Sequence, residues 1–152
     1  MSDVVHHLTL AHANKIVDEA LAQSRAMKLN PMVVIVLDAG GQVVVYKRED
    51  NAPLLRFEVA FGKAWGALGM GRPSRAFGQM AAERPHFVNA LVGASGGRLI
   101  PVAGGVLIRN SEKRIIGAVG TSGDTSDNDE IVAIKAIKSA GLASEPDNLP
   151  GG

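Results

Sequence analysis

The sequence predicts a single α+β domain in which helices cover a sheet of five mostly antiparallel strands. Three observations support this fold class. The length of 152 residues suits one domain, and 46% hydrophobic with 20% charged residues is ordinary for a globular chain. Helical and strand-like patterns follow one another in the order α-β-β-α-α-α-β-β-β-α. Short turns join neighbouring strand-like segments, which favours antiparallel hairpins over parallel crossovers.

Residues 9–28 carry the pattern of an amphipathic helix. Thr9 is a suitable N-cap, because its hydroxyl can accept a hydrogen bond from a free N–H of the first turn. Apolar residues recur mostly on one stripe of this segment, with charged and amide side chains elsewhere. The helix is expected to end at Asn30-Pro31, since proline forces the preceding residue out of the α region.

A β-hairpin is predicted after this helix. Residues 32–37 (MVVIVL) are continuously apolar and mostly β-branched, which is typical of a strand buried on both faces. The Asp-Ala-Gly-Gly sequence at residues 38–41 is a turn signal. Residues 42–47 (QVVVYK) then resume the strand pattern, and the short connection implies antiparallel pairing.

Residues 54–70 are predicted to be helical despite interior glycines. A glycine inside a helix costs about 1 kcal/mol relative to alanine. Gly62 and Gly66 therefore indicate close packing against another backbone or a ligand. Lys63 stands among alanines, so we expect its stem to be partly buried. The glycine and proline that follow residue 70 end the helix.

The second half of the chain contains shorter segments. Helices are predicted at residues 74–83 and 85–91, where serine and proline occupy favourable starting positions. Three short strands are predicted next, at residues 99–102, 104–109 and 114–119.

A final helix is predicted over residues 126–140. Ser126 or Asp127 is the expected N-cap, and Gly141 is the expected stop. Residues 143–152 are rich in proline and glycine, and we expect them to form a frayed tail.

Composition excludes several function classes. Sixteen Lys and Arg against fifteen Asp and Glu give a net charge of +1, whereas nucleic-acid-binding proteins usually show a clear basic excess. Cysteine is absent, which excludes disulfides and cysteine-ligated metal, and the four histidines form no metal-site pattern. No apolar run approaches the ~20 residues of a membrane span, and no signal-peptide pattern opens the chain. We expect a cytoplasmic protein without a nucleic-acid, membrane or metal partner.

Two glycine-containing sequences match catalytic or cofactor-binding motifs in their residues but not in their predicted structural context. Residues 93–97 match G-x-S-x-G, but the predicted helix precedes the serine and the strand follows it, the reverse of a nucleophile elbow. Residues 66–71 resemble a dinucleotide-binding loop, but they lie at a helix end. Neither sequence predicts the corresponding chemistry.

Candidate ligand-binding residues fall on the 54–70 helix and on two glycine-rich turns. Arg56, Lys63 and Arg72 form either a solvated face or a cationic wall for a small anionic ligand, since guanidinium groups match carboxylates. His86, at a helix start, is a further candidate. The turns supply backbone N–H groups that suit an anion. The full predicted set is Arg56, Lys63, Arg72, His86, Gly104, Gly105, Gly120, Thr121 and Ser122.

Four segments together resemble one known family. The opening LTL followed by VDEALAQSRAMKLNPMVVIVLDAGGQVVVYKRED, the FEVAFGKAWGAL helix, the IPVAGGVLI strand and IIGAVGTSGDTSDNDEIVAIKA occur in the same order in the GlcG/HbpS family of haem-binding proteins. The C-terminal domain of PduO-type proteins shares this pattern. The match covers about residues 8–142, the expected core of a single domain spanning 1–152.

This resemblance implies a profilin-like α-β-α fold, binding of haem or a related tetrapyrrole, and a homo-oligomer such as a tetramer or octamer. The family's helix lysine falls on Lys63, its Gly-Gly strand on Gly104 and Gly105, and its glycine-rich loop on residues 120–124. The sequence Leu-Leu-Arg at residues 54–56 departs from the family's usual small polar helix opening, which points to a smaller anionic ligand.

Two functional hypotheses therefore remain open, beside a third in which the chain is a purely structural partner subunit without a pocket. In the first, the protein binds haem or another carboxylate-bearing cofactor, and Arg56, Lys63 and Arg72 meet its propionates. In the second, it is a small lyase or isomerase acting on an organic acid, with Lys63 as base or electrophile.

Overall fold

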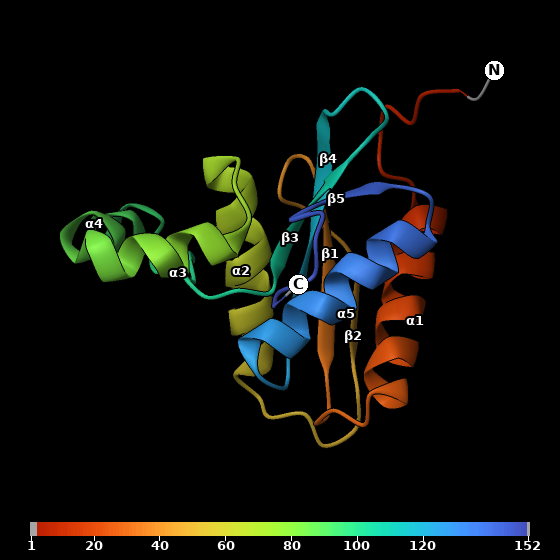
Figure 1. The fold of residues 1–152 in the computed structure, drawn as a ribbon, viewed down its shortest axis with the longest axis horizontal. Coiled ribbons are helices and arrows are strands. Elements are labelled where there is room, and N and C mark those ends of the chain that lie inside the picture. The colour runs from red at the N-terminus through yellow and green to blue at the C-terminus, as the bar shows by residue number, and fades with distance from the viewer. Residues whose placement is uncertain (1–2, 152) are drawn as a thin grey trace.

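The computed structural model describes residues 3–151 and confirms the α+β class (Figure 1). The helices are α1 (Leu10–Ala26), α2 (Arg56–Met70), α3 (Ser74–Glu83), α4 (Pro85–Ala94) and α5 (Ser126–Ser139). The strands are β1 (Val33–Asp38), β2 (Val43–Arg48), β3 (Gly105–Arg109), β4 (Ile115–Ser122) and β5 (Ala143–Glu145). They form one sheet in the order β2-β1-β4-β3-β5, and every neighbouring pair is antiparallel.

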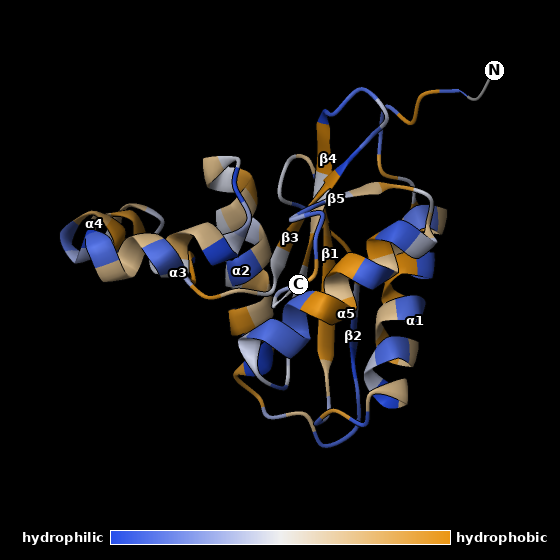
Figure 2. Ribbon diagram, in the orientation of Figure 1, coloured by the Kyte–Doolittle hydropathy of each residue, from blue (hydrophilic) through white to orange (hydrophobic). Residues whose placement is uncertain are grey.

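Helices cover both faces of the sheet, as an α-β-α fold requires. Figure 1 shows α1 and α5 on one side, α2 on the other, and α3 with α4 projecting away from the body. Two apolar clusters fill the two interfaces. Figure 2 shows hydrophobic residues along β1, while α1 and α5 alternate between hydrophobic and hydrophilic faces. No helix within residues 3–151 has the length and apolar character needed to cross a bilayer.

The interior position of strand β1 explains the continuous apolar run predicted to be buried on both faces. Residues 33–37 have no exposed surface, because β1 pairs with β2 and β4 and is covered by helices on each side. Val33 pairs with Arg48 of β2 and with Ser122 of β4. Directly paired residues project from the same face of a sheet. Arg48, Val33 and Ser122 therefore form one row across the end of the sheet that faces α2.

The fifth strand is not the one predicted from the sequence. Residues 99–102 form no strand; they lie along α2, where the N–H of Ile100 donates to the carbonyl oxygen of Gly62 at 3.3 Å. The strand that completes the sheet is β5, inside the predicted frayed tail, and it pairs with β3 through Leu107 and Glu145. The prediction of a frayed tail is therefore wrong for residues 143–145.

The helix ends lie within three residues of the predicted ones, and two N-caps differ: Pro73, not the expected Ser74, caps α3. The hydroxyl of Thr9 accepts from the N–H of His12 at 3.1 Å, as predicted for the first helix. The N-cap of α5 is Thr125, whose hydroxyl accepts from the N–H of Asn128 at 3.2 Å, and not Ser126 or Asp127. Gly141 follows α5 with a φ of +76°, a conformation that favours glycine.

Candidate functional site

Lys63 lies at the centre of a buried polar cluster between α2, β4 and α5. Only 2% of its side chain is exposed, so its burial is far more complete than the sequence predicts. Its ammonium group donates to the carbonyl oxygen of Thr121 at 2.9 Å and to Oδ2 of Asp129 at 3.2 Å. The hydroxyl of Thr121 lies 2.7 Å from the carbonyl oxygen of Asp129, to which it can donate. Polar groups of two helices and one strand thus satisfy one another's hydrogen-bonding capacity.

The glycine segments do approach α2 closely, as predicted, but they pack against its backbone. A Cβ atom on Gly120 would lie 2.0 Å from the carbonyl oxygen of Ala60. A Cβ atom on Gly105 would lie 2.2 Å from the carbonyl oxygen of Lys63, and one on Gly104 would lie 2.8 Å from the Lys63 ammonium nitrogen. Contacts this short require glycine. The space beside Lys63 is therefore filled by protein backbone.

Burial dominates the electrostatics of this cluster. It lowers the pKa of Lys63, although the neighbouring Asp129 carboxylate opposes that shift. Burial likewise raises the pKa of Asp129 and of Glu130 above their ordinary values. The guanidinium of Arg75 donates to both oxygens of Glu130, at 2.9 and 3.1 Å. These ion pairs link α2, α3 and α5, and their enclosure gives no support to Lys63 as a catalytic base.

The other predicted site residues separate into two groups. Arg56 lies beside Ser122, and its Nη1 donates to the Ser122 hydroxyl at 3.1 Å. Arg72 is exposed in the turn after α2, and His86 is exposed near the start of α4 on the projecting pair of helices. Among residues 3–151, neither of these two side chains makes a hydrogen bond or an ion pair with the Lys63 cluster.

A hollow of about 390 Å³ lies between β2 and the start of α2. We call it the apolar hollow; it is lined by Tyr46, Arg48, Leu54, Phe57 and Glu58. The ring of Tyr46 packs edge-to-face against the ring of Phe57, with ring centroids 4.9 Å apart and an interplanar angle of 87°. Leu54, on the rim of this hollow, is 90% exposed. An aromatic and aliphatic surface is thus open to solvent here.

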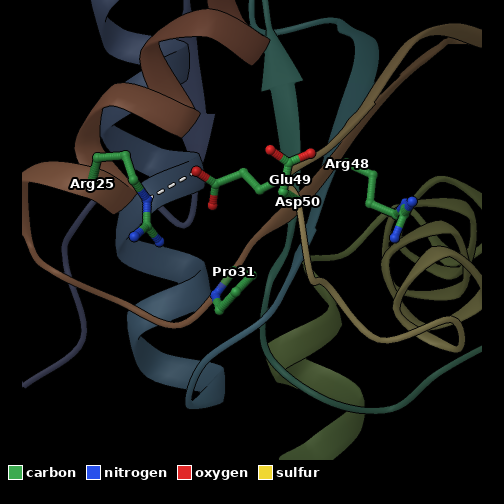
Figure 3. A pocket seen from close by; sticks show the side chains of 5 residues that line it. All are labelled: Arg25, Pro31, Arg48, Glu49 and Asp50. Carbon is green, nitrogen blue, oxygen red and sulfur yellow. Dashed lines mark ion pairs between the residues drawn. The ribbon is translucent and has the colours of Figure 1, made fainter.

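A second hollow, of about 370 Å³, lies on the other side of Arg48 (Figure 3). We call it the polar hollow; it is lined by Arg25, Pro31, Arg48, Glu49 and Asp50. Arg25 pairs with Glu49 at 2.9 Å, and Figure 3 shows the Arg48 guanidinium pointing away from this pair. Arg48 therefore borders both hollows.

Two guanidinium groups lie at this end of the sheet without a carboxylate partner. Arg48 donates through Nη1 to the carbonyl oxygen of Ala52 at 3.0 Å, and Arg56 donates to Ser122. Neither forms an ion pair within residues 3–151. The strands that carry Arg48 and Ser122 are separated only by β1, so their Cα atoms are about 10 Å apart. The start of α2 also lacks a side-chain cap.

Comparison with known proteins identifies the family. The family model described as "Haem degrading protein HbpS-like" matches residues 8–138. The chain belongs to the HbpS-like family. This confirms the resemblance seen in the sequence motifs.

Solved structures and a curated relative agree with this HbpS-like assignment. The PduOC:heme complex superposes with a TM-score of 0.81 at 24% identity, covering 90% of this chain and 97% of that one. Klebsiella pneumoniae protein ORFY gives a TM-score of 0.80 at 25% identity, covering 92% and 94%. An uncharacterised 15.0 kDa protein encoded between dhaT and dhaS in Citrobacter freundii is 27% identical over 137 residues, covering 90% and 94%.

The apolar hollow of this HbpS-like chain was not predicted from its sequence. Tyr46 and Arg48 occupy alternate positions of an edge strand, so they lie on one face, but half-exposed strands commonly carry such residues. The signal that was present is the Leu-Leu-Arg sequence at residues 54–56, which places two large apolar side chains and a cation at the start of a helix. Leu54 lines the apolar hollow, and Arg56 lies at the same end of the sheet.

Proposed function

We propose that this protein binds haem or a closely related tetrapyrrole in the apolar hollow between β2 and α2. The observation that carries the proposal is the wall of this hollow, which combines aromatic side chains with a guanidinium that lacks a carboxylate partner. Membership of the HbpS-like family and the fold shared with the PduOC:heme complex support the same ligand class.

The residues of the hollow fit an amphipathic, flat dicarboxylate. Phe57 and Leu54 offer an apolar surface for the macrocycle, whose burial contributes roughly 25 cal/mol per Å². Arg48 stands at the border with the polar hollow, where propionate groups would remain near water while accepting charge-assisted hydrogen bonds. The uncapped start of α2 adds the positive end of a helix dipole.

This proposal changes the roles of the residues predicted from the sequence. It retains Arg56 and Ser122 at the edge of the site, and it assigns Lys63 with Gly104, Gly105, Gly120 and Thr121 to the scaffold behind it. It leaves out Arg72 and His86, which are exposed elsewhere. Bound haem would supply an iron centre, while the chain binds the macrocycle, orients it and excludes water from one face.

We also propose that the protein is a homo-oligomer, a tetramer or octamer, as the family resemblance implies. Exposed apolar side chains outside the hollow support association, Leu10 and Leu55 among them. Light scattering coupled to size-exclusion chromatography measures the subunit number, and a monomer at micromolar concentration would contradict this part of the proposal.

Titration of the purified protein with hemin tests the ligand. We expect a saturable shift of the Soret band with one haem per chain. The Arg48→Gln variant should bind at least about tenfold more weakly, because it loses a charge-assisted contact worth roughly 1.5–3 kcal/mol. Arg114→Gln, an exposed arginine on the β3–β4 hairpin, is the matched control and should bind normally. The absence of a saturable shift in the unmodified protein would exclude haem as the ligand.

A further inference from the structure

We infer that Tyr46 is the residue that ligates the haem iron, through its phenolate oxygen. This inference rests on the proposed function, but it concerns an atom that the function itself does not require. It follows from which donor atoms line the apolar hollow, how the Tyr46 ring is held, and which charge lies beside it.

The apolar hollow offers very few atoms that can bind iron. Its lining contains no histidine, methionine or cysteine, and its only candidate donors are the Tyr46 hydroxyl and the Glu58 carboxylate. Tyrosine is an established protein ligand of haem iron. Glu58 is exposed near the start of α2, where water competes for its carboxylate. Tyr46 projects from β2, with its ring in contact with Phe57.

The Tyr46 ring is fixed while its oxygen is free. Its strand position is set by pairing with Ile35, a fully buried residue of β1. Its ring packs edge-to-face on Phe57, which in turn stacks on Phe61 with centroids 6.1 Å apart. Within residues 3–151, no side chain or backbone group forms a hydrogen bond with the Tyr46 hydroxyl. A rigid ring with an unpartnered oxygen is suited to ligation, since little motion must be frozen on binding.

Arg48 balances the charge that such a ligand introduces. It lies two residues after Tyr46 on the same strand, so both side chains project from the same face and line the same hollow. Ligation releases the phenol proton to the solvent. The resulting phenolate brings one negative charge to the apolar hollow, and the Arg48 guanidinium is the nearby cation without a carboxylate partner. Hard anionic oxygen ligands favour ferric over ferrous iron. The site is therefore expected to hold ferric haem more tightly than ferrous haem.

The test replaces Tyr46, the only tyrosine of the chain, by phenylalanine. Tyr46→Phe keeps the ring and its packing on Phe57 but removes the oxygen. Two ligands are titrated: hemin, and iron-free protoporphyrin, which has the same shape but no metal to ligate. We expect hemin affinity to fall at least tenfold in Tyr46→Phe, while the affinity for iron-free protoporphyrin stays unchanged. Resonance Raman spectra of the ferric complex should lose their iron–phenolate bands.

Two further variants sharpen the assignment. Tyr46→His should restore tight hemin binding with a nitrogen-ligated electron paramagnetic resonance spectrum, because the imidazole would stand at the same strand position. Glu58→Gln should keep the iron–phenolate bands, whatever the loss of its charge does to the affinity. The inference is overturned if Tyr46→Phe binds hemin with the same affinity and spectrum, or if Glu58→Gln loses the iron–phenolate bands. If the unmodified protein binds neither porphyrin, the proposed function fails along with the ligand assignment.

Discussion

The two polar regions that contact α2 use the same kinds of side chain for different purposes. In the Lys63 cluster every charge is paired, with Asp129 on Lys63 and Arg75 on Glu130, and all of them except the partly exposed Arg75 are buried. At the apolar hollow, Arg48 has only a backbone carbonyl as partner and the Tyr46 hydroxyl has no partner within residues 3–151. Buried charges must be satisfied for the chain to fold, whereas groups left unsatisfied beside an apolar surface are available to a ligand. Whether a charged or polar side chain is already paired, more than its residue type, distinguishes the scaffold from the proposed binding site.

The largest expected effect comes from breaking the buried ion pair. Lys63→Met leaves the Asp129 carboxylate buried without its cation, and we expect a loss of about 3–5 kcal/mol in the free energy of unfolding. The double variant Lys63→Met with Asp129→Asn should recover part of this loss, because no unpaired charge remains. Denaturant-induced unfolding at neutral pH measures both. A loss below about 1 kcal/mol in the single variant would mean that water reaches the cluster.

The next effect tests the close approach of the glycine segments to α2. Gly120→Ala places a methyl group 2.0 Å from the carbonyl oxygen of Ala60, so β4 and α2 must separate. We expect a loss of about 3 kcal/mol, at the upper end of ordinary overpacking. Gly93→Ala is the control, because a Cβ there meets nothing within 4 Å, and it should be neutral or slightly stabilising. Thermal unfolding compares the two, and equal melting temperatures would contradict the packing described for β4 and α2.

A smaller effect concerns the dependence of stability on pH. Burial raises the pKa of Glu130 above its ordinary value of 4.5, so the folded state holds this proton to higher pH than the unfolded state does. The stabilisation from the protonated form is therefore present below pH 4.5 and is lost as pH rises through the folded-state pKa. Each unit of displacement contributes about 1.4 kcal/mol.

Glu130→Gln removes this titration. The difference in free energy of unfolding between the unmodified protein and Glu130→Gln should therefore decrease as pH rises from 4 towards neutrality. Glu112→Gln, at an exposed carboxylate of the β3–β4 turn, serves as control for removing a charge. Urea unfolding at several pH values gives the slopes. A difference that grows with pH over this range would mean that pairing with Arg75 outweighs burial.

The extent to which the sequence predicts this molecule depends on how local each signal is. Gly62 costs helix stability, so close packing was predictable, and a Cβ there would indeed lie 2.2 Å from the carbonyl oxygen of Arg98. The partner of Lys63 was not predictable, because Asp129 is 66 residues away in the sequence. Asp129 also lies in the first turn of α5, where acidic residues are common at any helix start. Strand β5 has three residues and no periodic pattern, so its own sequence does not predict it. It is recognised only in the structure, where it pairs with the edge of β3.

The smallest expected effect on stability, that of Arg48→Gln, is the most specific test of the contrast between the apolar hollow and the Lys63 cluster. Arg48→Gln should change the free energy of unfolding by less than about 0.5 kcal/mol, because the side chain is exposed and no carboxylate depends on it. The same substitution should weaken hemin binding at least about tenfold, whereas a buried charge of the Lys63 cluster affects stability first. Unfolding and hemin titration of one Arg48→Gln preparation give both numbers. A large loss of stability with unchanged binding would assign Arg48 to the scaffold, and the apolar hollow would lose its cation.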